Sequence, residues 1–483
     1  MALKAKLRQI FYPPSLPGEK KLVRKIDFFI LTFSCLGYFT NYLARSNIDN
    51  AYGLGMKEEL GFAEDSLTQI KAAFTAGYVV GQIPVNLSLH YVRPRVFFPA
   101  CMVAWAGLSM VTAAVHNAQS IAAIRFFLGV AEASTFVGTH YILGSWYTKR
   151  ELGKRSGLFT ASGLVGALLG GFIQTGIWSS LDQNNGLSGW RWLFIINGLI
   201  TLPVAAFGFV FFPDTPSTTK AFYLSDDEKA LAIARVPRVA NRSPWSWRFV
   251  KRTATSKLFW GFMILWILAG EIESFSSNGL LGQWLRNVPG HPFTEAEANL
   301  YPTFLPAVGI GSALVFPTIT DFLNGRRYVV AYFVAGIGII TPPLILAAQR
   351  LPFGYQSVSM VIGSYTWAGT VSAGQAAIFA WANDALSYEE HMLRAVVLAG
   401  MNVGSLVINA WWSIVFYGAW MAPWFTRGMY AMIAVSIVLA VWTGAFSYYL
   451  ARYHRAREEE RNVESVEESS EESIQMKEKD DLA

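Results

Sequence analysis

Three of the charged side chains inside long apolar stretches of this sequence are the strongest candidates for chemistry. Arg45 follows Asn41 by one turn in the first stretch, so the two residues share a helix face. Arg125 and Glu132 are seven residues apart in the fourth stretch, which places both on one side of a helix, facing the same cavity. At roughly 10 Å along a straight helix they are too far apart for a direct salt bridge.

These residue types suit the binding of an anion together with a proton. A guanidinium in a dry cavity holds a carboxylate through paired hydrogen bonds. A carboxylic acid beside it feels two opposing effects, since burial favours its neutral form and arginines favour its ionised form, so it can exchange a proton near neutral pH. The sequence therefore predicts an anion and proton site, with an Arg–Glu network that only braces helices as the alternative.

Other polar residues in apolar stretches are weaker candidates. Lys71 either contacts the substrate or extends to the outer membrane interface. Glu271 and Glu273 either face the cavity or bracket a helix break near Gly270. For Asn383, and for other amides such as Asn402 and Asn409, hydrogen bonding between helices is the favoured interpretation, with substrate contact or gating as the alternative.

The elements that must position these residues are membrane helices. The chain has 483 residues, of which 53% are hydrophobic and only 15% charged, whereas soluble chains carry about 25% charged residues. This composition excludes a soluble enzyme or a nucleic-acid-binding protein. Twelve apolar spans are expected near 26–45, 68–90, 97–116, 119–142, 156–178, 191–212, 258–282, 298–320, 328–347, 358–383, 395–419 and 428–450.

Basic residues in alternate connections predict the orientation, because Lys and Arg are enriched on the cytoplasmic side. They occur in the N-terminal tail and in the connections at 90–95, 149–155 and 326–327. Both termini are then cytoplasmic. The expected organisation is a tail (1–23), a six-helix bundle (24–212), a basic cytoplasmic linker (213–256), a second bundle (257–452) and an acidic disordered tail (453–483).

Two six-span halves joined by a basic loop resemble a major facilitator carrier, in which substrate binds midway through the membrane between the halves. The loop from Asp321 to Arg327 and its counterpart from His90 to Arg95 occupy equivalent places in the two halves. Both depart from the superfamily's acidic-basic-glycine-basic pattern. We expect them to latch helices through charged hydrogen bonds rather than to contact substrate.

Almost the whole chain, from Lys25 to Arg457, resembles the anion:cation symporter branch of that superfamily, in particular its fungal allantoate-permease group. The motifs that carry the resemblance are Asn41-Tyr-Leu-Ala-Arg-Ser-Asn-Ile-Asp-Asn-Ala51, Gly77-Tyr, Arg125-Phe through Glu132-Ala133, Gly189-Trp-Arg-Trp192 and Pro213-Asp-Thr-Pro216. The elements Ala51-Tyr and Gly55-Met-Lys-Glu-Glu are most similar to the pantothenate-transporter subgroup.

The resemblance implies roles for individual residues. Arg45 matches the span-one arginine of the family, and Arg125 and Glu132 match its span-four pair for anion binding and proton coupling. Many relatives have an acid where this chain has Ala44, so coupling here relies on Glu132 alone or recruits Asp49. The full predicted substrate site is Arg45, Arg125, Asn41, Tyr42, Lys71, Tyr78 and Asn402, with Glu132 and Asp49 for proton coupling and Glu271, Glu273 and Asn383 as second-half candidates.

The leading hypothesis is proton-coupled import of a small organic anion such as pantothenate, by a monomer in the cell membrane. The alternatives are a non-transporting nutrient sensor, a carrier of a different anion such as allantoate, nicotinate or a sulfonate, and a drug-exporting antiporter, against which the cavity arginines argue. No nucleotide-binding loop, zinc-ligand spacing or catalytic nucleophile motif is present in the sequence. We therefore expect no enzyme activity, cofactor, metal or nucleic-acid partner.

Overall fold

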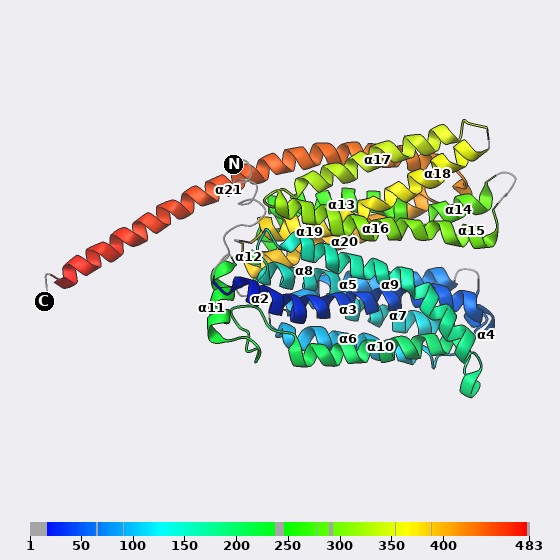
Figure 1. Cartoon of the computed structure of the whole chain (residues 1–483), viewed down its shortest axis with the longest axis horizontal. Helices are drawn as coiled ribbons and strands as arrows, with labels where there is room; N and C mark the ends of the chain where they lie inside the picture. Colours follow the sequence, from blue (N-terminus) through cyan, green and yellow to red (C-terminus); the bar gives the residue numbers. More distant parts are fainter. Residues whose placement is uncertain are drawn as a thin grey trace.

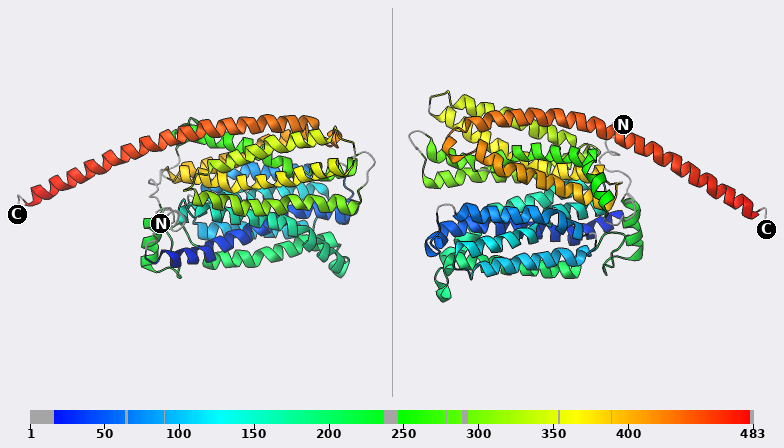
Figure 2. Two further views of the ribbon diagram at one scale, coloured as in Figure 1. Left: turned by 45° about the horizontal axis from the view of Figure 1, so that its top comes forward. Right: turned by 180° about the vertical axis from the view of Figure 1, so that it is seen from behind.

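The computed structural model describes residues 17–63, 66–89, 91–236, 246–277, 279–288, 293–352, 354–387 and 389–480. All regular elements in these ranges are helices. Figure 1 shows two layers of long, nearly parallel helices, with the first half of the chain in the lower layer and the second half in the upper one. The right view in Figure 2, from behind, shows the same separation. The expected all-α fold in two bundles is confirmed.

The first bundle begins with five contiguous helical segments, from α2 to α4, and then alternates helices with short connections. Its elements are α2 (Glu19–Ile26), η1 (Asp27–Leu31), α3 (Thr32–Ala51), η2 (Tyr52–Met56), α4 (Lys57–Glu59), α5 (Ser66–Ser88), α6 (Pro94–Thr112), α7 (Ala118–Glu132), α8 (Thr135–Trp146), α9 (Leu152–Leu181), η3 (Asn184–Gly186) and α10 (Gly189–Phe211).

The second bundle follows a linker that contains α11 (Asp226–Arg235) and α12 (Trp247–Ala254). Its elements are α13 (Lys257–Ser277), α14 (Leu280–Asn287), α15 (Glu295–Leu300), η4 (Tyr301–Thr303), α16 (Phe304–Phe322), α17 (Tyr328–Ala348), α18 (Tyr355–Ala368), η5 (Gly369–Ser372), α19 (Ala373–Ala385), α20 (His391–Phe416), η6 (Ala419–Met421) and α21 (Thr426–Asp480).

Nine helical stretches in the described ranges are long and apolar enough to cross a membrane. The other three predicted spans are also helical. Two of them, α3 and α5, are less apolar over a membrane-length window, and the third is divided into α18 and α19, of 14 and 13 residues. The lower hydropathy of α3 and α5 reflects the charged and polar residues that they carry, among them Arg45, Asp49 and Lys71.

The linker docks on the first bundle through charged contacts. Ser225 and Glu228 form a capping box at the start of α11, and Lys25 of α2 donates to Glu228 at 2.7 Å. At the other end of α11, Arg235 pairs with Glu19 at 3.1 Å and with Glu151 at 2.5 Å. Figure 1 shows α2, α11 and α12 at one end of the molecule. The basic connections therefore gather at that end.

The C-terminal segment differs from the expected disordered tail. The backbone of α21 continues as one helix from the second bundle to Asp480 and extends well beyond the bundles (Figure 1). No glycine or proline follows Gly444, and the segment is rich in Glu, Arg and Lys, which are good helix formers. A tail with few apolar residues cannot form a hydrophobic core, but its residues can still favour a helix locally.

Candidate functional site

A polar cavity of about 240 Å³ lies between the two bundles, lined by α3, α5 and α8 from the first and by α13, α19 and α20 from the second. Its lining contains one guanidinium, one carboxylate, several amides and three phenols. The charged and amide groups are Arg45, Glu273, Gln375, Asn402 and Asn409. A hollow with convergent polar groups between two apolar bundles is suited to a small polar ligand.

Arg45 is the only cation among the described residues that line this cavity. Its Nε donates to Glu132 Oε2 at 3.0 Å, and its guanidinium lies 4.6 Å from the ring centre of Tyr78. The described residues provide no other hydrogen bond to this guanidinium. Since the side chain is 29% exposed, both Nη atoms are available to a ligand.

Glu132 supplies the counter-charge from behind the cavity wall. It is the last residue of α7, its side chain is fully buried, and it is absent from the cavity lining. The fourth span is interrupted between α7 and α8, at Ala133 and Ser134. No glycine or proline in the sequence predicts this interruption. The predicted association of Arg45 with span four thus takes the form of a direct ion pair with Glu132.

Arg125 lies apart from the cavity. It is buried in α7 with its guanidinium 5.7 Å from the ring centre of Phe194, and its Nη2 has no hydrogen-bonding partner among the described residues. It shares a helix with Glu132 but not the cavity that Arg45 reaches. The expectation that Arg125 and Glu132 face this cavity together is therefore not met in this conformation, because Glu132 turns to Arg45.

Lys71 and Asp49 form an ion pair with each other, and both side chains are about half exposed. Neither belongs to the cavity lining. The sequence predicts that Lys71 either contacts the substrate or extends to the outer interface; in this structure it pairs with Asp49 on α3, so each residue neutralises the other.

The tyrosines and amides of the predicted site lie close to Arg45. Tyr42 lines the cavity and accepts a hydrogen bond from Tyr38 at 3.2 Å, while Asn41 is buried one turn before Arg45. Asn402 Nδ2 donates to the Tyr78 hydroxyl at 3.4 Å. This contact joins α20 of the second bundle to α5 of the first across the cavity.

The two glutamates of α13 have different environments. Glu273 lines the cavity and has no ion-pair partner among the described residues. Glu271 is buried beside it, outside the lining, and accepts a hydrogen bond from Asn409 at 3.4 Å. The expected helix break near Gly270 is wrong, because α13 is continuous to Ser277. The glycine instead leaves room for Ser405 of α20.

Asn383 belongs to a contact between the bundles rather than to the cavity. Its Oδ1 accepts from Arg394 Nε at 2.8 Å, and its amide donates to the His140 carbonyl at 3.1 Å. Arg394 also donates to the Tyr141 carbonyl at 3.0 Å. These bonds join α19 and α20 to α8, and Gly144 of α8 leaves the space that the Arg394 side chain occupies.

A second contact lies at the end where the basic connections gather. Arg327 donates to Asp384 Oδ2 at 2.6 Å, pairs with Asp321 at 3.2 Å and donates to the Lys149 carbonyl of the first half at 2.8 Å. Asp321 also accepts from the backbone nitrogen of Gly153 at 2.9 Å. The predicted latching role of the 321–327 loop is confirmed, since its charged side chains bond both to Asp384 of the second half and to backbone groups of the first half.

Sequence reasoning missed Tyr38, Gln375 and Ser405 in the cavity lining. Tyr38 had a usable signal, since it lies one turn before Tyr42 on the face that carries Arg45. The other two are small or uncharged residues in second-half helices, and helix-packing roles explain such residues equally well.

Known proteins with similar sequences are transporters. The family model described as "Major Facilitator Superfamily" matches residues 34–387. The chain is 39% identical to "Pantothenate transporter liz1" of Schizosaccharomyces pombe, over 91% of this chain and 84% of that protein. It is 40% identical to "Pantothenate transporter FEN2" of Saccharomyces cerevisiae, over 87% and 82% of the two chains.

Solved structures show the same fold at low identity. The proton:xylose symporter XylE aligns with a TM-score of 0.65 and 11% identity, over 88% of this chain and 96% of that one. The transporter FucP aligns with a TM-score of 0.60 and 13% identity, over 86% and 98%. With the two bundles, the cavity between them and the family match all in agreement, this chain belongs to the major facilitator superfamily and is a membrane transporter, not an enzyme.

Proposed function

We propose that this chain imports pantothenate together with protons, by alternating access, as a monomer in the cell membrane. The observation that carries the proposal is the Arg45 guanidinium, which lines the cavity between the bundles with both Nη atoms free of partners among the described residues. Pantothenate is a small carboxylate, and two similar proteins are named pantothenate transporters. Its carboxylate would bind the two Nη atoms through paired hydrogen bonds.

Substrate and proton binding are then linked through Arg45. Glu132 is fully buried, and the Nε of Arg45 provides its ion pair. When a substrate carboxylate shares that cation, an ionised Glu132 becomes costly away from water, so Glu132 takes up a proton. Arg45, the substrate carboxylate and the protonated Glu132 then carry no net charge together. Asp49, the other proposed coupling residue, is already paired with Lys71.

We further propose that the end carrying α2, α11 and α12 faces the cytoplasm, with twelve spans and both termini on that side. The basic connections lie there, as the positive-inside rule requires. The Arg327 and Arg394 contacts join the bundles in this conformation. Release of substrate to the cytoplasm would require these contacts to break while the cavity opens at that end.

Uptake into sealed vesicles tests the proposal. Purified protein is reconstituted into liposomes and given labelled pantothenate with an acidic outside. We expect accumulation above the external concentration, and its loss when a protonophore removes the gradient. A non-transporting sensor would give no entry, and an uncoupled carrier would stop at equal concentrations. Accumulation of labelled allantoate or nicotinate under the same gradient, without accumulation of pantothenate, would assign a different anion.

A further inference from the structure

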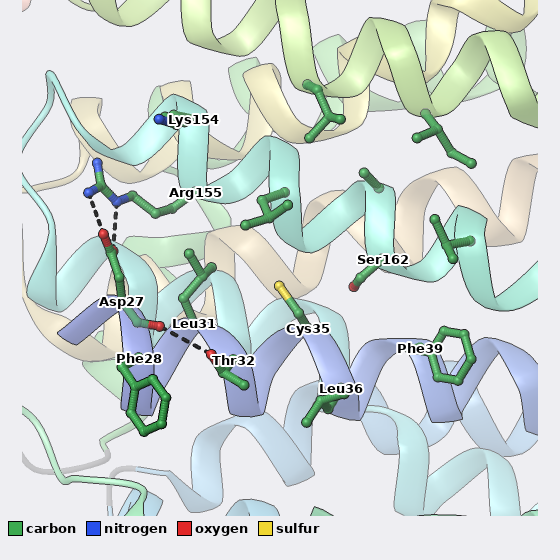
Figure 3. A pocket seen from close by; sticks show the side chains of 15 residues that line it. Asp27, Phe28, Leu31, Thr32, Cys35, Leu36, Phe39, Lys154, Arg155 and Ser162 are labelled. Carbon is green, nitrogen blue, oxygen red and sulfur yellow. Dashed lines mark hydrogen bonds and ion pairs between the residues drawn. The ribbon is translucent and has the colours of Figure 1, made fainter. Parts of the chain in front are cut away.

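A second and larger cavity, of about 750 Å³, lies as a groove between α3 and α9 of the first bundle and α16 of the second. Figure 3 shows its side chains, with Asp27, Lys154 and Arg155 at one end and Phe39 toward the other. It shares no lining residue with the central cavity. Its volume falls within the range of about 300 to 1,000 Å³ that is common for small-molecule sites.

The groove has the length and polarity of one lipid chain. Asp27 and Phe39 are twelve residues apart, which corresponds to about 18 Å along a helix. One leaflet of a bilayer contributes about 15 Å of hydrocarbon. Between its ends the wall is apolar apart from small groups such as Cys35 and Ser162. Leu36 and Leu158 are 42% and 43% exposed, so the rim is open to the surrounding membrane.

The charged end of the groove carries an unpaired cation. Arg155 is already bound, since it donates to both carboxylate oxygens of Asp27 at 2.9 and 2.8 Å. The neighbouring Lys154 side chain is exposed and has no ion-pair partner among the described residues. Its backbone nitrogen donates to Asp321 of the other half at 2.7 Å, which fixes the start of α9 beside the groove.

Further positive charge surrounds this end. The bond from Arg327 to the Lys149 carbonyl brings the connections before α9 and after α16 together, and both carry an exposed arginine, Arg150 and Arg326. Basic pockets between membrane helices on the cytoplasmic side attract anionic lipid headgroups. A zwitterionic headgroup also offers a phosphate, but its own ammonium group offsets that charge, so an anionic headgroup leaves more negative charge for Lys154 and the neighbouring arginines.

We propose that this groove binds one anionic phospholipid of the leaflet that contacts the basic connections, with an acyl chain along α3 and α9 and the headgroup phosphate on Lys154. The site is independent of the substrate cavity. Its walls come from both bundles, so a lipid bound there also holds α9 and α16 in the arrangement seen in this structure.

Native mass spectrometry of the full chain tests the site. The protein is purified in mild detergent and mixed with phosphatidylglycerol or phosphatidylcholine of identical acyl chains. We expect one phosphatidylglycerol to be retained about fivefold more strongly than phosphatidylcholine, the order expected for one lysine near an anionic headgroup. Lys154→Gln should remove that preference, and Lys154→Arg should keep it. Equal retention of the two lipids by the native chain would overturn the proposal.

Two further variants separate the groove from general surface charge. Leu158→Trp narrows the apolar wall and should lower retention of the lipid while leaving Lys154 in place. Lys220→Gln removes an exposed linker lysine away from the groove and should retain phosphatidylglycerol as the native chain does. If Lys220→Gln lowers retention as much as Lys154→Gln, or if neither Lys154→Gln nor Leu158→Trp lowers it, the groove is not the site.

Discussion

Two of the arginine and carboxylate networks between the helices of this protein differ in how completely the arginine is bound. Arg327 contacts Asp321, Asp384 and the Lys149 carbonyl, and its side chain is fully buried. Arg45 contacts Glu132 through Nε alone and is 29% exposed to the cavity. A saturated arginine holds elements together, whereas an arginine with free donors in a hollow is ready to bind a ligand.

The largest expected effect is on stability at the saturated network. Arg327→Gln leaves two buried carboxylates without their cation, so we expect the free energy of unfolding to fall by about 3 to 5 kcal/mol. Thermal unfolding of purified protein in detergent measures this. The adjacent Arg326 is exposed, and Arg326→Gln should change stability by less than about 0.5 kcal/mol. Equal stability of the two variants would mean that the network does not join the halves.

At Arg45, which has free Nη donors, we expect a large loss of ligand binding and only a small loss of stability. Arg45→Lys keeps the charge but loses the planar pair of Nη donors, so the affinity for pantothenate should fall at least about tenfold. Unfolding of the ligand-free protein should change much less than for Arg327→Gln. Binding is measured by the stabilisation that added pantothenate gives. An unchanged affinity in Arg45→Lys would remove this residue from the substrate site.

A third network lies in the linker and gives a pH dependence. Burial alone raises the pKa of Glu228, but hydrogen bonds from Lys25 and the Ser225 backbone, with the charges of Lys25 and Lys21, lower that pKa overall. The stabilisation is therefore present above the ordinary value of 4.5 and is lost as pH falls through the lower folded value. Glu228→Gln should cost about 1 kcal/mol at pH 7. A difference from the native chain that persists undiminished at pH 3 would contradict this explanation.

The smallest expected effect is on pantothenate affinity, and it distinguishes the two glutamates of α13. Glu273 lines the cavity without an ion-pair partner among the described residues, so its ionised form is costly there and its neutral form can hydrogen-bond to the substrate, whereas Glu271 does not reach the cavity. Glu273→Ala should weaken pantothenate binding about threefold at pH 7, the order of one lost hydrogen bond. Glu271→Gln should leave the affinity unchanged. If Glu273→Ala strengthens binding, Glu273 is ionised and repels the substrate instead.

The sequence predicted the residues of the cavity better than their contacts. Arg45, Tyr42, Tyr78, Asn402 and Glu273 all line the cavity or hydrogen-bond within it. Charged and polar groups are costly in apolar spans, and this cost makes them visible in the sequence. The two-bundle fold was predictable for the same reason, since apolar spans and basic connections alternate.

The pairing of Arg45 with Glu132 was not predictable, because it depends on the relative rotation and height of two helices and on a break after Glu132 that has no sequence signal. The same limit applies to Arg394 and Asn383, whose bonds to α8 depend on the space beside Gly144. Periodicity gives the face of a helix, but contacts between bundles follow from packing that a single span does not encode.

The central claim, that Arg45 links substrate binding to proton binding at Glu132, is tested most directly by Glu132→Gln in reconstituted vesicles. Gln keeps the shape of the side chain and a hydrogen-bond acceptor for Arg45 but cannot bind and release a proton. We predict that accumulation driven by a proton gradient is abolished, while exchange of labelled for unlabelled pantothenate continues. Asp49→Asn serves as the control. Gradient-driven accumulation in Glu132→Gln equal to that of the native chain, with its loss in Asp49→Asn, would contradict the claim.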